Sequence, residues 1–313
     1  MGCKKFVTFD FVEGNYILKM TAESQARKSK LVYRTEMNVL SFPKFTAMDF
    51  NLFFTICYYA SSHFKKYGMK RIIRNFKNEV KRGYSEDNDE NFVEIKFSDL
   101  KVFLPKIKNT KRFYKEILDF SKYKLRFVGV DRVRYTLGKN DKNKIAPFFY
   151  EILVDEEEEL LKVKLTSYAY SMLNDFGNFM SFDMNEFCSL ENKYTKSLFR
   201  LLKQYENLNS CADKKDSNVR EVSMSKDEFA KFMDTPSDYN VNDLERKVIN
   251  PSIKEIITKN IFNGSVNKVW SIQNIDYERI FEEFDKDKIE ENKNEENKKR
   301  KVKGFKFIFE KKK

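Results

Sequence analysis

Residues 189–206 carry the clearest helical pattern in the chain. Four apolar side chains recur at the three- and four-residue spacing of one helix face, namely Leu198, Leu201, Leu202 and Tyr205. Three basic side chains recur at the same spacing on another face, namely Lys196, Arg200 and Lys203. Asn192 or Thr195 is placed to cap the start of the helix. The pattern therefore predicts an amphipathic helix with an apolar face in a core and a basic face toward solvent.

The first half of the chain mixes helical and strand-like patterns. Thr46 precedes an apolar stretch at residues 47–60, which predicts a buried helix that Thr46 caps. Alternation at residues 93–97 predicts a short strand, and Ser98 would cap a short helix at 99–104. The pattern then predicts a longer basic helix and four strands, at residues 110–123, 124–130, 133–137, 147–154 and 160–165.

The second half of the chain repeats this order. An alternating strand at residues 220–224 leads into a short helix at 226–233, which Ser225 would cap. A longer helix follows at 241–259, and Pro251 should kink or divide it because proline has no backbone N–H. The remaining expected elements are two short helices (166–173 and about 183–187), strands within 261–272, a charged loop or helix at 278–303 and a closing strand at 304–309.

The order of strand, capped short helix, turn, longer basic helix and hairpin is that of a winged helix, and it occurs twice. We therefore expect an α+β fold with two tandem winged-helix domains that are related by internal duplication. The expected division is an N-terminal arm at residues 1–30, a first domain at 31–165 and a second domain at 166–313. The alternative is two ordinary α+β lobes without a shared role.

The composition of the chain indicates which kind of partner and which cellular compartment to expect. The chain of 313 residues has a formal net charge of +12, which favours a polyanionic partner such as nucleic acid. It contains no run of about 18 apolar residues, so no membrane helix is expected and the expected location is the cytoplasm. Its 4 cysteines are scattered without a Cys-x-x-Cys pair, which favours free thiols in a reducing compartment.

Sequence patterns of catalysis are missing. His63 is the sole histidine of the sequence, so a histidine metal site cannot form, including the one beside the nucleophilic tyrosine of a rolling-circle nuclease. The sequence has no Gly-x-x-x-x-Gly-Lys-[Ser/Thr] loop for a nucleotide and no Gly-x-Ser-x-Gly elbow. We therefore expect no catalytic residue, no metal and no cofactor, and a function that depends on binding.

Two segments resemble the Rep initiator family, which starts theta-type replication of bacterial plasmids. The first is Lys193-Tyr-Thr-Lys-Ser-Leu-Phe-Arg-Leu-Leu-Lys-Gln-Tyr205, in which Phe199 stands where the family has tyrosine. The second is Asn242-Asp-Leu-Glu-Arg-Lys-Val-Ile-Asn-Pro-Ser-Ile-Lys-Glu-Ile256, where the family also tolerates a proline. The resemblance covers about residues 31–269 and is strongest in the second half.

The resemblance implies a plasmid replication initiator in the bacterial cytoplasm. Such a protein would bind directly repeated origin sequences in double-stranded DNA, help to open AT-rich DNA and recruit host replication proteins such as a helicase or an initiator. It would form a homodimer in equilibrium with a monomer, with the first domain as the dimer interface, and would repress its own gene. Two other classes stay open: a winged-helix transcriptional regulator without an origin role, and an interaction module that does not bind DNA.

A winged helix places the second helix of its helix–turn–helix in the major groove, where the first turns meet base edges. In the second domain this predicts base contacts from Asn240, Asn242, Arg246 and Lys247, with Lys254 also on the outside. In the first domain the expected DNA contacts are Lys108, Asn109, Lys111, Arg112 and Lys115, with Arg132 and Arg134 on a wing. Lys196, Arg200 and Lys203 would contact the DNA backbone or nothing. For any single residue the alternative is a solvated helix face or a phosphate contact.

Overall fold

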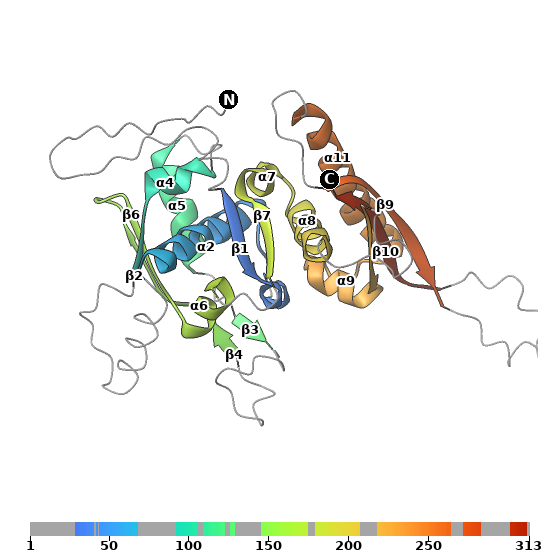
Figure 1. Ribbon diagram of the computed structural model, residues 1–313, viewed down its shortest axis with the longest axis horizontal. Coiled ribbons are helices and arrows are strands. Elements are labelled where there is room, and N and C mark those ends of the chain that lie inside the picture. Colours follow the sequence, from blue (N-terminus) through green and yellow to red (C-terminus); the bar gives the residue numbers. More distant parts are fainter. Residues whose placement is uncertain are drawn as a thin grey trace, which may run out of the picture.

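The computed structural model describes residues 29–40, 42, 44–67, 92–104, 109–122, 126–128, 145–174, 179–206, 218–263, 272–282 and 301–311. In these residues the chain forms two lobes of helices and antiparallel strands, which lie on either side of helix α8 (Lys193–Tyr205) (Figure 1). The lobes follow one another along the sequence, as the colours of the ribbon show.

The first lobe contains a winged helix. Its helices are α2 (Ala47–Tyr67), α4 (Phe97–Val102) and α5 (Thr110–Ser121), and its sheet strands are β2 (Phe92–Lys96), β5 (Phe149–Asp155) and β6 (Leu160–Leu165). The strands form an antiparallel sheet in the order β2-β6-β5. A separate pair, β3 (Arg126–Val128) and β4 (Ile145–Pro147), lies beside it. The segment of the expected strand at residues 133–137 is outside the described residues.

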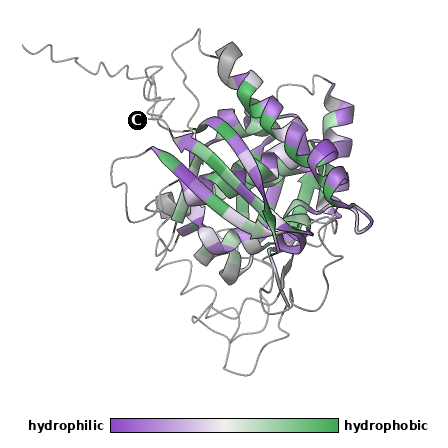
Figure 2. Cartoon of the chain, turned by 90° about the vertical axis from the view of Figure 1, so that its right-hand side faces the viewer, coloured by the Kyte–Doolittle hydropathy of each residue, from purple (hydrophilic) through white to green (hydrophobic). Residues whose placement is uncertain are grey.

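The second lobe repeats the same order of elements. After α8, it consists of β8 (Val219–Ser225), α9 (Lys226–Met233), α10 (Val241–Asp243), η3 (Leu244–Ile249), α11 (Asn250–Asn263), β9 (Ile272–Phe281) and β10 (Val302–Lys311). Its sheet has the order β8-β10-β9, the counterpart of β2-β6-β5. Figure 2 shows this sheet with helices behind it and with hydrophobic and hydrophilic residues alternating along the strands, as one buried face requires. The α+β fold with two tandem winged helices is therefore confirmed.

A strand pair outside both winged helices closes the first lobe. β1 (Lys30–Arg34) pairs with β7 (Phe179–Asp183), and η1 (Thr35–Val39), α6 (Ser167–Asn174) and α7 (Met184–Ser189) accompany it. The backbone N–H of Met184 also donates to the carbonyl of Ser29 at 2.9 Å. The expected division between residues 165 and 166 thus separates two strands that are hydrogen-bonded to each other, and residue 30 of the expected arm already belongs to β1.

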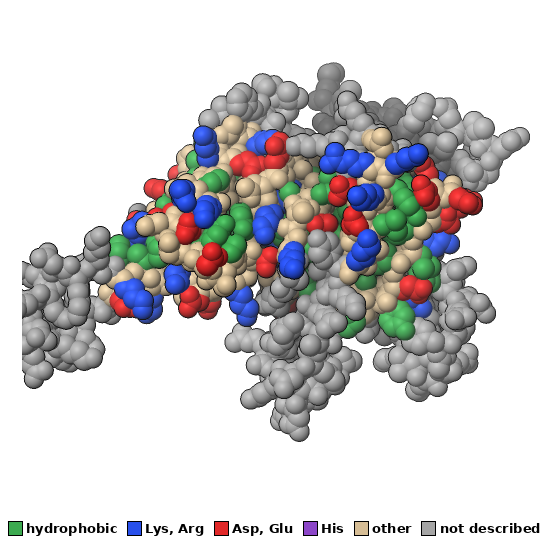
Figure 3. Space-filling model, turned by 180° about the vertical axis from the view of Figure 1, so that it is seen from behind, with side chains coloured by type: hydrophobic (Ala, Val, Ile, Leu, Met, Phe, Trp, Pro, Cys, Tyr) green, Lys and Arg blue, Asp and Glu red, His purple; other side chains and the backbone are tan. Residues whose placement is uncertain are grey.

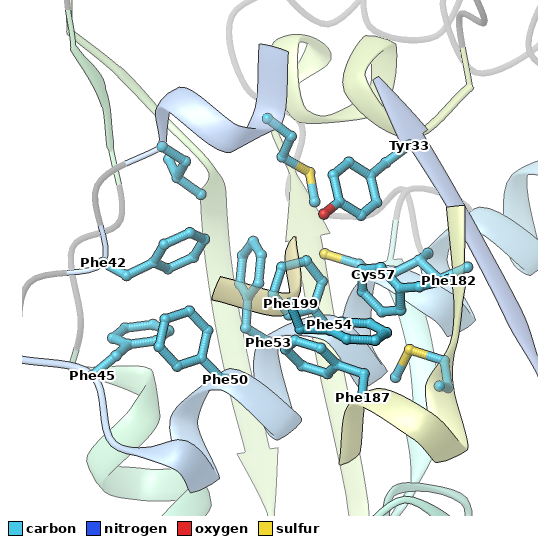
Figure 4. Packing of buried hydrophobic residues seen from close by; sticks show 14 of the residues in the cluster. Tyr33, Phe42, Phe45, Phe50, Phe53, Phe54, Cys57, Phe182, Phe187 and Phe199 are labelled. Carbon is cyan, nitrogen blue, oxygen red and sulfur yellow. The ribbon is translucent and has the colours of Figure 1, made fainter. Parts of the chain in front are cut away.

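Aromatic rings fill the core of the first lobe (Figure 4). The ring centroid of Phe54 on α2 lies 4.9 Å from that of Phe187 and 5.5 Å from that of Phe182. Phe199 of α8 continues this cluster, with its centroid 6.0 Å from Phe182. Burying each such side chain contributes about 1.5–3 kcal/mol, and suitably oriented ring pairs add to this. The core therefore holds α8 firmly against the first lobe.

Helix starts agree with several predicted caps. The side-chain oxygen of Thr46 accepts the backbone N–H of Asp49 at 3.2 Å, and Asn192 accepts that of Tyr194 at 2.8 Å. Ser225 and Glu228 form a reciprocal capping box at the start of α9. The prediction for Ser98 was wrong, because α4 already begins at Phe97 and Ser98 lies inside it.

Pro251 changes the form of the helix that contains it. The residues before it form the π-helical segment η3, and the backbone N–H of Asn250 donates to the carbonyl of Glu245, five residues earlier. Because Pro251 has no N–H and its ring crowds the preceding turn, the wider π-turn relieves a conflict that a continuous α-helix would contain. The helix is not divided at Pro251, as the alternative in the prediction had it: the hydrogen-bond pattern changes from π to α there, and the continuous helix runs beyond residue 259 to Asn263.

The strands after this helix differ from the expectation. The part of residues 261–272 that the structure describes is the end of α11 and the first residue of β9. Strand β9 then runs into the charged segment that was expected to be a loop or helix, and Tyr277 pairs with Phe307 of β10. β9 lies at the edge of its sheet with one face toward solvent, so charged residues such as Asp276 and Glu278 can alternate with buried ones.

Candidate nucleic-acid interface

The third helix of each winged helix starts in the same way. This third helix is α5 in the first domain and the continuous α10–η3–α11 in the second. The side-chain oxygen of Asn109 accepts the backbone N–H of Arg112 at 3.0 Å, and that of Asn240 accepts the N–H of Asp243 at 3.0 Å. Both asparagines therefore act as N-caps, which stabilise a helix start by about 1 kcal/mol. A base contact from either one stays a prediction.

The third helix of the second domain presents cations around one carboxylate. Arg246 lies 3.4 Å and Lys247 2.9 Å from Asp243, and the Arg246 side chain is 76% exposed. The ammonium group of Lys247 also lies 4.4 Å from the centroid of the Tyr239 ring. The hydrogen bond from Lys247 holds the pKa of Asp243 below its ordinary value. Exposed ion pairs of this kind are weak, so a phosphate or a base edge can displace them.

Two further predicted contacts on this helix, Asn242 and Lys254, are exposed. Figure 3 shows Lys and Arg side chains on both lobes of one face of the molecule, interspersed with acidic ones. On this face the basic side chains are thus not confined to one lobe. Such an arrangement suits a long polyanion better than a compact anion.

An ion pair joins the third helix of the second domain to strand β9. The Nε atom of Arg279 donates to the Glu245 carboxylate at 2.6 Å, and its terminal nitrogen donates to the other carboxylate oxygen. Two parallel hydrogen bonds fix the relative position of the two groups. Glu245 directly precedes Arg246 and Lys247 in the sequence, so this contact also positions the turn that carries them. The sequence pattern missed it because Arg279 lies in the segment that was expected to be a loop or helix.

The third helix of the first domain also has a basic outer face. Lys111, Arg112 and Lys115 are exposed on α5, and the Arg112 side chain is 72% exposed. Arg112 lies 3.7 Å from Glu116 one turn later, which is again a weak surface pair. The remaining predicted contacts of this domain, Lys108, Arg132 and Arg134, lie outside the described residues.

The three basic residues of α8 were expected on a face toward solvent, and this expectation was wrong. Lys196, Arg200 and Lys203 are all buried, because α8 packs between the two lobes. The ammonium group of Lys196 donates to the carbonyl of Phe187 at 2.6 Å, and Lys203 pairs with Glu206. Helical spacing alone cannot distinguish a face open to water from one that a second domain covers. None of the three belongs to the proposed interface.

The described part of the chain lacks two other kinds of site. It contains no group of three or more His, Cys, Asp or Glu side chains arranged to hold a metal ion. No helix within the same residues is both long and apolar enough to span a bilayer.

Two protein-family models match the chain, one over each winged helix. The family model described as "Initiator Replication protein, WH1" matches residues 30–203, and the one described as "Initiator Rep protein, WH2" matches residues 225–309. A comparison with curated proteins found no match. Among solved structures, the "Crystal structure of Pi initiator protein in complex with iteron DNA" aligns with 91% of this chain and 98% of that chain, at a TM-score of 0.49 and 16% sequence identity.

The WH1 match alone covers more than half of the chain and ends within α8, and the WH2 match covers the second winged helix from the start of α9 to β10. The chain therefore belongs to the family of plasmid replication initiator proteins.

Proposed function

We propose that the chain starts plasmid replication by binding directly repeated origin sequences, with the third helix of each domain in a major groove. One observation carries this proposal: both domains have the same topology, and both present an Asn-capped third helix with exposed basic side chains. Successive major grooves on one side of a duplex are about 10 base pairs apart. A single chain would then read one end of a repeat with each domain.

Affinity and specificity come from different residues in this proposal. Lys111, Lys115 and Lys254 contact phosphates, where each contact releases counterions and strengthens binding to every sequence. Arg112 and Arg246 contact base edges, because a guanidinium can donate two hydrogen bonds to the O6 and N7 atoms of guanine. The net charge of +12 supports the general attraction to DNA but carries no sequence information.

The proposed role in origin opening needs no catalysis by the chain. Binding energy bends and strains the duplex beside the repeats, and AT-rich DNA is the easiest to separate. The separated DNA strands would then pass to host replication proteins such as a helicase or an initiator. Those proteins would supply the ATPase activity for which this chain has no sequence pattern. The chain acts as a binding platform and not as an enzyme.

We further propose that the first domain forms a homodimer in equilibrium with a monomer, and that the dimer represses the chain's own gene. β5 is an edge strand of its sheet, and Tyr150 and Leu153 on it are exposed. An edge strand with exposed apolar side chains favours pairing with a second copy. Leu153→Lys should then shift the equilibrium to the monomer in sedimentation across a concentration series. A single mass for the wild type at every concentration would contradict the dimer.

The pairing of β1 with β7 supports a different division from the one that the sequence pattern predicted. We propose that the first domain runs from residue 30 to about residue 190 and that α8, most of which still falls within the WH1 match, is the first helix of the second winged helix, as α2 is of the first.

Footprinting on DNA that flanks the gene tests the proposed function. We expect protection of several direct repeats of about 20 base pairs, two successive grooves each, beside an AT-rich stretch. A single protected site without neighbouring repeats would instead favour the winged-helix transcriptional regulator. Loss of all duplex binding at moderate salt would favour an interaction module.

A further inference from the structure

Arg200 is the largest side chain among those that the core buries completely. It is 1% exposed, and aromatic rings surround its guanidinium on several sides. The central carbon of that group lies 4.7 Å from the ring centroid of Phe42, 5.3 Å from Phe54 and 5.7 Å from Phe232. Phe42 and Phe54 belong to the first domain and Phe232 to α9 of the second, while Arg200 lies on α8 between them. The guanidinium therefore lies at the junction of the two domains.

Arg200 has no carboxylate partner among the described residues. One terminal nitrogen donates to the side-chain oxygen of Asn38 at 2.8 Å, while the Nε atom has no partner there. Burial lowers the pKa of Arg200 from its ordinary value and raises that of the neighbouring Tyr33 to about 12. Burying a charge without an ionic partner costs free energy, which the aromatic rings around the guanidinium offset only in part. Stability alone does not account for an arginine here.

The hydrogen bonds around Arg200 fix the orientation of α8 relative to the first domain. Asn38 accepts from Arg200 and also donates, from its amide nitrogen, to Gln204 at 2.8 Å and to the sulfur of Met180 at 3.1 Å. Arg200 and Gln204 are one turn apart on α8, so one asparagine of the first domain holds two successive turns of that helix. Hydrogen bonds constrain orientation, whereas apolar packing alone allows small rotations.

We infer that Arg200 is a positioning residue that sets the angle between the two winged helices and, with it, the spacing of the two groove contacts that one chain can make. The inference rests on the proposed reading of one repeat by both domains. Arg200 does not touch DNA in this arrangement; it acts through the α8 junction.

The test measures affinity for repeats in which base pairs are inserted between the two ends. The wild type should lose at least about tenfold in affinity when 5 base pairs, half a helical turn, are inserted. Arg200→Met keeps an apolar filling of similar length, so it should unfold at an equal or higher temperature yet lose less than about threefold on the same insertion. Lys231→Met removes one exposed charge from α9 and should behave like the wild type.

Each outcome decides a different point. If Arg200→Met is as sensitive to the insertion as the wild type, Arg200 does not set the angle and the inference is wrong. If the wild type itself tolerates the insertion, the two domains do not read one repeat together, and the proposed function fails with the inference. Should Arg200→Met not fold, Asn38→Leu, which removes the acceptor from the first domain, is judged by the same two criteria.

Discussion

Removing the Arg279 guanidinium should destabilise the second domain more than neutralising its partner Glu245. The two side chains differ in burial: that of Glu245 is 11% exposed and that of Arg279 is 41% exposed. Arg279→Met leaves a carboxylate in a mostly buried place without its main partner. Glu245→Gln leaves a guanidinium that can turn toward water.

The burial of the two side chains sets the expected changes in the free energy of unfolding. Breaking a fully buried pair costs 3–5 kcal/mol, so a pair this near the surface should give about 2 kcal/mol for Arg279→Met and about 1 kcal/mol for Glu245→Gln. The double variant leaves no buried carboxylate without a partner. It should therefore lose about 1 kcal/mol of stability, well below the sum of the losses in the two single variants. The cycle therefore predicts a coupling of about 2 kcal/mol.

Urea unfolding of the four proteins at pH 7 measures this cycle, and base preference in DNA binding can be followed on the same samples. Both single variants should relax sequence preference at the end that Arg246 reads, because they free the turn that precedes it. Two results would refute the reasoning: single effects that add to within about 0.5 kcal/mol, or a Glu245→Gln cost as large as that of Arg279→Met.

Three further predictions follow from individual contacts. Asn240→Ala should cost about 1 kcal/mol in unfolding experiments, while Asn240→Ser keeps the cap and restores stability; a serine variant that folds normally but loses base preference would show a base contact instead. Gly304→Ala should destabilise the second domain by about 1–3 kcal/mol, because a Cβ there would lie 2.2 Å from the carbonyl oxygen of Met224; an unchanged melting temperature would contradict this. Burial raises the pKa of the half-buried Cys188 to about 12 from 9.0, so in a variant that keeps only this thiol, labelling at pH 8 should be at least about tenfold slower in folded than in unfolded protein.

Local patterns in the sequence predicted most of the local structure. The spacing of apolar residues located α2, α5, α8 and α9, and the capping residues Thr46, Asn192 and Ser225 marked where three of the helices begin. These features succeed because they depend on residues within one or two turns of each other. The π-helical segment before Pro251 is of the same kind, since it follows from the missing N–H of one residue.

Contacts between distant parts of the chain were not predictable in this way. β1 and β7 are about 150 residues apart, and neither is long enough for its alternation to stand out. The basic face of α8 has the spacing of a solvated face, but residues of the first lobe and of α9 cover it. Arg279 and Glu245 are 34 residues apart and meet only through the fold. The exposed candidates on α5 and on α10–α11 were predictable because the winged-helix order itself places them outside.

Footprinting of arginine variants on a repeat that is mutated base by base tests the two-domain reading most directly. Arg246→Ala should relax preference at one end of the repeat and Arg112→Ala at the other, about 10 base pairs away, each at a cost of about 1–3 kcal/mol for the preferred base. Lys254→Ala should weaken binding to all sequences alike and reduce the salt dependence by about one counterion. If both arginine changes alter the same few base pairs, or if neither changes sequence preference, the two domains do not share one repeat.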